Sequence, residues 1–152
     1  MIKTKYKELE KKFNLPKFED LNEEFEIGAI DLERSGTLIK AILRVMNTKI
    51  ISFLNFLDPI TNPNPHSVHS RIEIAHLTVE EKKEIFKFYK ELSYLLHIGL
   101  TTELKSQKEI AKFINETWKK YPKLKKKEIQ LLEIISETWT KELPKEKNNY
   151  IT

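Results

Sequence analysis

Residues 37–57 read TLIKAILRVMNTKIISFLNFL, the most apolar run of the chain. Its large apolar side chains recur at steps of three and four residues, so on a helix they form one wide apolar face. Polar residues recur at the same steps and fall on the opposite side: Lys40, Arg44, Asn47, Thr48, Ser52 and Asn55. Asp58-Pro59 follows, and proline lacks the N–H group that would continue the helix. The pattern predicts a central helix over about residues 37–57 that ends before Pro59.

The polar side of this stretch argues against a membrane span, because a charged side chain at the centre of a bilayer costs about 2.5 to 3.5 kcal/mol. No other segment approaches the length of uncharged apolar sequence that a span needs, and the first residues lack the apolar core of a signal peptide. The chain contains no cysteine, which removes disulfides and thiolate metal sites and suits a reducing compartment. We therefore expect a soluble, cytoplasmic protein that does not bind membranes.

The composition of the 152-residue chain favours helices. Only three glycines and six prolines occur, whereas Lys, Glu, Leu and Ile dominate, and this balance suits helices with short connections better than a sheet with many turns. The formal net charge is +4, and residues 105–152 hold 12 Lys+Arg against 7 Asp+Glu. The length is that of one ordinary domain, so we predict a single all-α domain over residues 1–152.

Two capping boxes mark helix starts beyond the central stretch. In such a box a Thr or Ser and a Glu three residues later satisfy each other's backbone N–H groups. The two boxes are Thr78 with Glu81 and Ser106 with Glu109. Gly99 and Pro122 are placed to end these two helices, and a last helix is expected over about residues 123–143. The chain is thus predicted to form an irregular bundle of four to five helices.

The two ends of the chain carry weaker signals. Residues 1–22 contain a short amphipathic pattern and a proline, and we expect a peripheral segment there. Residues 23–35 fit a helix, with Gly28 and Gly36 as its weak points. Residues 145–152 are expected to be a disordered tail.

The region between the central helix and Thr78 predicts irregular structure. Residues 60–70 are rich in proline and asparagine, and residues 71–77 alternate apolar with polar side chains, which suits a short extended piece without a partner strand. Three histidines fall here: His66, His69 and His76. Their spacing is compatible with zinc, with Asp58 or Glu73 as a further ligand. Histidines in such a loop are more often plain polar residues, and we predict no metal or cofactor.

Arg71 and His76 have the Arg-x4-His spacing, in the sequence RIEIAH. The spacing resembles the motif of the HEPN ribonucleases, a family of helical proteins that act without metal. The resemblance implies that His76 takes a proton from the attacking 2′-hydroxyl and that Arg71 holds the charge that develops on the phosphate. Ile72 stands where that family commonly has a polar residue, and the match covers six residues. No nucleophile elbow, phosphate-binding glycine loop or dinucleotide fingerprint occurs, so enzyme activity is not favoured.

Six lysines fall within nine residues around Pro122. We call them the lysine cluster: Lys119, Lys120, Lys123, Lys125, Lys126 and Lys127. Concentrated positive charge attracts phosphate backbones by releasing counterions, and Tyr121 and Trp118 are placed to stack on unpaired bases. The structural alternative is a solvated junction between two helices, since lysine lacks the bidentate fork of arginine. The lysine cluster predicts, as an alternative function, binding of RNA or another polyanion.

Three longer segments, taken together, carry a wider resemblance: FEIGAIDLERSGTLIKAIL, LTVEEKKEIFKFYKEL and FINETWKKYPKLKK. They look like a group of small lysine-rich helical proteins from archaea that have no established activity. The resemblance spans about Phe25 to Leu143 and implies a helical fold without implying a function. The absence of catalytic motifs and the abundance of large apolar residues favour, as the leading hypothesis, a non-enzymatic interaction module that binds a protein partner or associates with itself.

Overall fold

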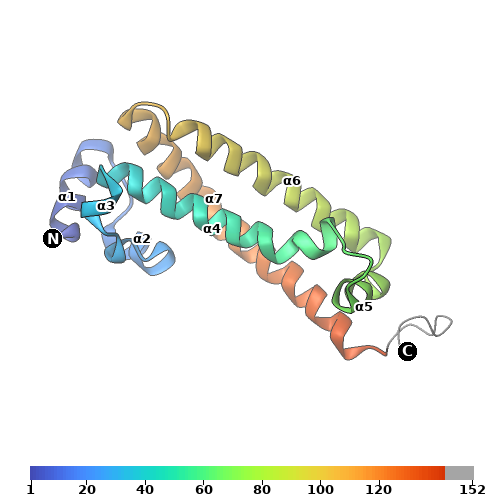
Figure 1. The fold of residues 1–152 in the computed structure, drawn as a ribbon. Coiled ribbons are helices and arrows are strands. Elements are labelled where there is room, and N and C mark those ends of the chain that lie inside the picture. The colour runs from blue at the N-terminus through green and yellow to red at the C-terminus, as the bar shows by residue number, and fades with distance from the viewer. Residues whose placement is uncertain (143–152) are drawn as a thin grey trace. The chain divides into compact units, whose positions relative to one another are not determined.

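The computed structural model describes residues 1–142, apart from the side chain of Ser35, and is all-helical over that range (Figure 1). The described residues form seven α-helices and two short 3-10 turns, with no strand. The all-α prediction is confirmed, but the helices outnumber the four to five expected. None of the described helices has both the length and the apolar character required to cross a bilayer. The tail predicted for residues 145–152 lies outside the described residues.

The chain divides into two compact units, each assembled from two separate stretches of sequence. Unit 1 comprises Met1–Ser52 and Tyr94–Lys123, and unit 2 comprises Phe53–Ser93 and the stretch that starts at Leu124. Three long helices supply residues to both units. These are α4 (Leu38–Thr61), α6 (Val79–Thr102) and α7 (Gln107–Glu137). The single-domain interpretation of the sequence stays a prediction.

The N-terminal part of unit 1 is more helical than its sequence suggests. It contains α1 (Ile2–Phe13), α2 (Phe18–Phe25), the 3-10 turn η1 (Ile27–Ala29) and α3 (Leu32–Ser35). Tyr6 of α1 and Leu21 of α2 are fully buried, so residues 1–22 contribute to the core of unit 1. The single helix expected over residues 23–35 is wrong. Glu26 adopts the left-handed conformation that ends α2, and Gly36, with φ 70°, ends α3.

Helix α4 supplies most of the remaining core of unit 1. Its buried apolar residues there are Leu38, Ile39, Ala41, Ile42, Leu43, Met46 and Ile50. Asn47 was expected on the polar side but is only 3% exposed. It is buried because Gly99 of α6 leaves room for its amide, and a Cβ atom on Gly99 would lie 2.1 Å from Asn47 Oδ1. Gly99 therefore lies inside α6, at a close approach of the two helices, and the prediction that it ends the helix is wrong.

The end of α4 lies in unit 2 and passes through Pro59. The prediction that the central helix ends before Pro59 is wrong, because the helix continues to Thr61. Pro59 removes one backbone donor, but the last turn keeps the hydrogen bond from Asn62 N–H to Asp58 O at 2.7 Å. The turn also buries Leu57 and Ile60 in the core of unit 2.

Helix α7 likewise runs through Pro122, where the sequence predicted a break between two helices. A proline inside a helix costs about 3 kcal/mol, whereas burying one large apolar side chain yields about 1.5–3 kcal/mol. Both units bury side chains of α7, Ile114 and Tyr121 in unit 1 and Leu131 and Ile135 in unit 2. The burial on each side outweighs the lost hydrogen bond, so the prediction of two separate helices is wrong.

Residues 68–76 of unit 2 form helix α5 (Val68–His76), and the predicted extended piece at residues 71–77 is wrong. Ser67 starts the helix, since its side chain accepts a hydrogen bond from Ser70 N–H and its carbonyl accepts one from Arg71 N–H. Helix α5 packs against the 3-10 turn η2 (Thr138–Thr140), which follows α7. The irregular loop is therefore shorter than expected and covers residues 62–67.

The first capping box is confirmed in full. Thr78 N–H donates to Glu81 Oε1 at 2.8 Å, and Glu81 N–H donates to Thr78 Oγ1 at 3.0 Å, at the start of α6. At the start of α7, Glu109 N–H donates to Ser106 Oγ at 3.3 Å. Both helix starts were predictable because the signal is local.

Candidate functional site

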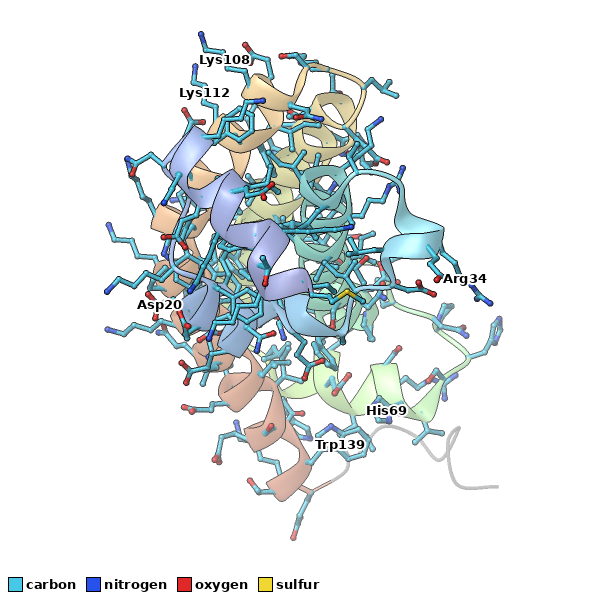
Figure 2. The ribbon with its side chains drawn as sticks, turned by 90° about the vertical axis from the view of Figure 1, so that its left-hand side faces the viewer. Asp20, Arg34, His69, Lys108, Lys112 and Trp139 are labelled. Carbon is cyan, nitrogen blue, oxygen red and sulfur yellow. The ribbon has the colours of Figure 1, made fainter. Side chains whose placement is uncertain are left out.

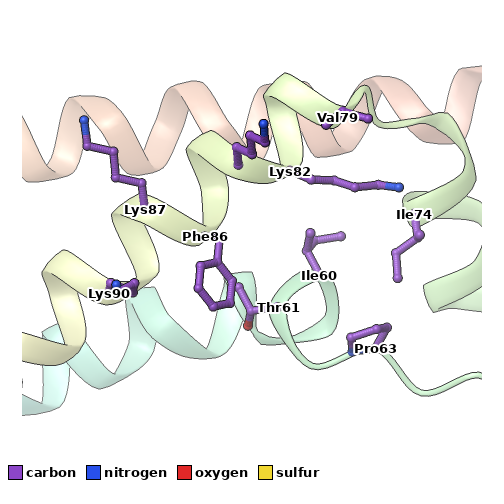
Figure 3. A pocket seen from close by; sticks show the side chains of 10 residues that line it. Ile60, Thr61, Pro63, Ile74, Val79, Lys82, Phe86, Lys87 and Lys90 are labelled. Atoms are coloured by element: carbon purple, nitrogen blue, oxygen red, sulfur yellow. The ribbon is translucent and has the colours of Figure 1, made fainter.

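A groove on unit 2 lies between the end of α4, helix α5 and the first half of α6 (Figure 3). We call it the α6 groove. Its apolar lining consists of Ile60, Pro63, Ile74, Val79 and Phe86, and its polar lining of Thr61, Lys82, Lys83, Lys87 and Lys90. Its volume is about 630 Å³, which is within the range of about 300–1,000 Å³ that is usual for ligand sites.

The spacing of residues along α6 explains why apolar and basic side chains share this groove. Val79, Lys83, Phe86 and Lys90 follow one another at steps of four, three and four residues, so they lie on one side of the helix. The opposite side is buried in unit 2 by Ile85, Phe88 and Leu92. Val79 and Phe86 consequently remain 60% and 51% exposed, although both side chains are apolar.

Two of the three glutamates near the start of α6 are engaged outside the groove. Glu81 caps the helix at Thr78, and Glu84 forms an ion pair with Lys127 of α7. In contrast, none of the four groove lysines forms an ion pair with another residue in the part of the chain that the structure describes. No carboxylate lines the groove either. The lining of the α6 groove therefore carries positive charge and no negative charge.

A hydrogen bond from η2 holds helix α5, which forms one wall of the groove. Trp139 Nε1–H donates to Glu73 Oε2 at 3.0 Å, and Glu73 is only 6% exposed. The side chains of His69 and Trp139 lie next to each other (Figure 2), with their ring centres 4.5 Å apart. The Nε2 atom of His69 also lies 3.7 Å from Glu73 Oε2. Ile74, which lines the groove, directly follows Glu73 in α5. The Trp139–Glu73 hydrogen bond thus attaches α5, the helix that carries Ile74, to η2.

The three candidate zinc ligands do not converge. Within residues 1–142, no three His, Asp or Glu side chains are grouped closely enough to hold a metal ion. The backbone of His66 donates to Asn64 Oδ1 at 3.0 Å, and His69 faces Trp139 and Glu73. The Nε2 atom of His76 is buried and has no hydrogen-bond partner among the described residues.

Arg71 and His76 lie on the same helix, but not on one side of it. A separation of five residues rotates two side chains about 140° apart around an α-helix. Arg71 Nε–H donates to the carbonyl of Pro65 at 2.8 Å, while His76 has its Nε2 atom buried. The two side chains thus leave α5 in different directions, and the ribonuclease role that the resemblance implies stays a prediction.

All six residues of the lysine cluster lie on α7. Lys119, Lys120 and Lys123 belong to unit 1 and are exposed. In unit 2, Lys127 pairs with Glu84, and Lys125 also has a partner. The cluster is thus a stretch of one continuous helix, and part of its charge is already engaged.

Tyr121, the aromatic residue predicted to assist nucleic-acid binding, is only 4% exposed. Its ring lies 4.7 Å from that of Phe25 and is stacked with that of Trp118 at 6.3 Å. Burial, followed by the nearby Glu24 carboxylate, raises the pKa of the Tyr121 hydroxyl above its usual value. The ring is part of the core of unit 1 and is not available to stack on a base.

No family model matches the chain. Curated proteins and solved structures give no match either. The resemblances to the HEPN ribonucleases and to the lysine-rich archaeal proteins therefore stay predictions.

The α6 groove was missed by reasoning from the sequence, although one signal was present. Val79 and Phe86 are apolar residues that fall off the buried face of the helix, which is the pattern of an exposed apolar stripe. The rest of the lining could not be found, because Ile74 was assigned to an extended piece. Ile60 was expected in an irregular loop, because the sequence around it has no local helix signal.

Proposed function

We propose that the chain is a non-enzymatic interaction module that binds a protein partner through the α6 groove. The observation that carries the proposal is the pair of half-exposed apolar side chains, Val79 and Phe86, over an apolar hollow of about 630 Å³. Apolar surface that is rimmed by polar residues is typical of protein-interaction sites. Aromatic side chains at the centre of such a hollow commonly supply much of the binding energy.

The chemistry of the lining supports binding in preference to catalysis. Thr61 and the four lysines are the only polar side chains among the ten lining residues, and neither a histidine nor a carboxylate is among them. General acid–base or metal-assisted chemistry in a site usually relies on such groups.

Photocrosslinking tests the proposal directly. A benzophenone analogue of phenylalanine placed at position 86 would lie in the groove, whereas the same analogue at Phe56 would be equally exposed in unit 2 but outside the groove. After irradiation in native lysate, we expect one defined protein adduct at position 86 and none at position 56. An adduct of twice the mass of the chain would identify the partner as a second copy. Equal labelling at both positions, or none at either, would contradict the proposal.

We also propose, as a second candidate, that exposed lysines of the cluster bind RNA or another polyanion. Lys119, Lys120 and Lys123 support it, because they are exposed within five residues of one helix and have no ion-pair partner in residues 1–142. RNA binding should then weaken steeply with salt, and reversal of these three lysines to Glu should abolish it. Reversal of Lys83, Lys87 and Lys90 provides a matched control that should leave RNA binding intact. Binding that does not depend on salt would rule this candidate out.

A further inference from the structure

We infer that the occupant of the α6 groove is an acidic amphipathic helix of a partner protein. Its apolar side chains would enter the hollow around Phe86, and its carboxylates would face the groove lysines. This inference rests on the proposed function and specifies the partner that the groove selects.

The apolar lining favours a helix over an extended peptide. Ile60, Ile74 and Val79 are aliphatic and surround one aromatic ring, so they suit the Leu, Ile and Phe side chains that an amphipathic helix presents at steps of three and four residues. An extended peptide usually binds by adding a strand to a sheet edge, and the described residues contain no strand. A groove between helices is the common receptor for a helical ligand.

The charge of the rim selects an acidic ligand. Lys83, Lys87 and Lys90 follow one side of α6 over about 10 Å, because each residue advances a helix by about 1.5 Å. Carboxylates at the same steps on a helix laid along the groove would face these ammonium groups. Each exposed ion pair contributes only about 0.2–1 kcal/mol, so the apolar contacts would supply most of the affinity. The lysines would mainly decide which helices are accepted and how fast they associate.

A second copy of the chain offers acidic sequence but little exposed apolar surface beside it. Residues 18–33 contain seven Asp or Glu residues and no Lys or Arg. However, three of its large apolar residues, Leu21, Phe25 and Ile27, are at most 5% exposed within unit 1, and the other three, Phe18, Ile30 and Leu32, are partly buried. The three buried side chains cannot enter a groove on another molecule while that unit is folded. The segment therefore presents little apolar surface to the hollow around Phe86.

Nucleic acid fits the groove less well than an acidic helix. Bases bind to flat aromatic surfaces, whereas four of the five apolar lining residues are aliphatic or proline. The positive charge comes only from lysine, which lacks the planar fork that grips phosphate in two places. The same lysines pair readily with single carboxylates.

The inference can be tested by fluorescence anisotropy with the full chain and labelled helical peptides. The acidic peptide has Leu and Phe at positions i, i+3, i+4 and i+7 and Glu on the flanking positions. Its companions have Gln or Lys in place of every Glu. We expect the acidic peptide to bind at least about tenfold more tightly than the Gln peptide at low salt, and this ratio to shrink as salt is added.

Charge reversal in the groove should invert the preference. The variant Lys83→Glu/Lys87→Glu/Lys90→Glu is expected to bind the Lys peptide and to reject the acidic one. The variant Lys119→Glu/Lys120→Glu/Lys123→Glu changes the net charge equally but should keep the original preference. Phe86→Ser is a second groove variant that removes an exposed side chain and should weaken all three peptides without altering their order. Circular dichroism would confirm that each variant is helical.

The outcomes separate the inference from the proposed function. If the acidic and Gln peptides bind equally, or if both triple variants behave alike, the inference that the ligand is acidic is wrong. A protein adduct at position 86 would in that case still support an interaction module with a different partner. A crosslinked partner that lies on the groove with a basic segment would likewise overturn the inference alone. If position 86 gives no specific adduct, the proposed function itself fails.

Discussion

At Gly99, a missing side chain allows the buried amide of Asn47 to lie against the backbone of α6. A methyl group at position 99 would lie 2.1 Å from Asn47 Oδ1 and 3.0 Å from Phe113 Cζ. We predict that Gly99→Ala lowers the free energy of unfolding by about 1–3 kcal/mol, despite the better helix propensity of alanine. Urea denaturation followed by circular dichroism would measure the change.

The variant Asn47→Ala provides the control for this prediction. The amide of Asn47 has no hydrogen-bond partner among the described residues, so its removal costs little and makes room for the new methyl group. The double variant Gly99→Ala/Asn47→Ala should be more stable than Gly99→Ala by about 1 kcal/mol or more. Additive effects of the two substitutions would show that the two positions do not clash.

Glu128 gives unit 2 a dependence on pH. The side chain is 3% exposed, and neither carboxylate oxygen has a hydrogen-bond partner among the described residues. Burial raises the pKa of Glu128 to about 7, from an ordinary value of 4.5. Between these two values the folded chain binds more protons than the unfolded chain, so stability is highest at low pH and declines as the pH rises towards 7.

We predict that Glu128→Gln removes this decline. From pH 5 to pH 8, the wild-type chain should lose about 2 to 3 kcal/mol of unfolding free energy relative to the variant. Urea titrations of both proteins at the two pH values would give the difference. Glu133→Gln changes an exposed carboxylate on the same helix and should leave the wild-type dependence in place. Parallel pH profiles for wild type and Glu128→Gln would show that Glu128 is not the group responsible.

Helix α5 is short, and the Trp139–Glu73 hydrogen bond links it to η2 within unit 2. Trp139→Phe keeps an aromatic ring beside His69 but removes the indole donor from a buried carboxylate. Leaving such a group unsatisfied costs about 1–3 kcal/mol. We predict that amide hydrogen exchange in α5 becomes faster in this variant, while exchange in α1, which belongs to unit 1, stays unchanged.

Two further variants separate the hydrogen bond from simple packing at this position. Glu73→Gln retains an oxygen that accepts from the indole, so α5 should exchange almost as slowly as in the wild type. Removing both partners, in Glu73→Leu/Trp139→Phe, should cost less than Trp139→Phe alone, because no polar group is left unsatisfied. Slow exchange in the single Trp139→Phe variant would mean that the hydrogen bond does not hold the helix.

Sequence patterns correctly predicted helix boundaries where the signal is local. They failed where a residue far away in the sequence determines whether the helix ends. The capping box at Thr78 and Glu81 involves only neighbours and could be read directly. A proline ends many helices, but α4 and α7 continue through Pro59 and Pro122. Side chains beyond each proline are buried, and this burial is visible only in the tertiary structure. The role of Gly99 depends on Asn47, which lies in a different helix.

The candidate site was less predictable than the helices that carry it. A groove is a property of three elements together, and one of these, α5, was expected to be extended. The residue types of the histidines and of the Arg71/His76 pair are common in catalysis, but the structure groups no three of the described His, Asp or Glu side chains at a metal site. An exposed phenylalanine has no such chemical label, and its exposure follows only from the packing of the opposite side of α6.

For the whole molecule, neither unit is encoded by a contiguous segment. A fragment of residues 1–93 contains only part of each unit. It lacks Tyr94–Lys123 of unit 1 and the stretch of unit 2 that starts at Leu124. We predict that this fragment alone has little helix and no cooperative urea transition, because both cores are incomplete. Mixing it with residues 94–152 should restore helical circular dichroism and a cooperative transition. A cooperative transition of fragment 1–93 alone, with the midpoint of the intact chain, would contradict the prediction.

The same discontinuity affects how the chain is made on the ribosome. Helix α4, the most apolar part of the sequence, is complete at Thr61, but its neighbours in unit 1 end only at Lys123. At about 5–20 residues per second, the delay between these two points is on the order of 3 to 12 s. During that time the apolar face of α4 has no finished core to enter. We therefore expect the nascent chain to be a substrate for chaperones that bind apolar segments emerging from the exit tunnel.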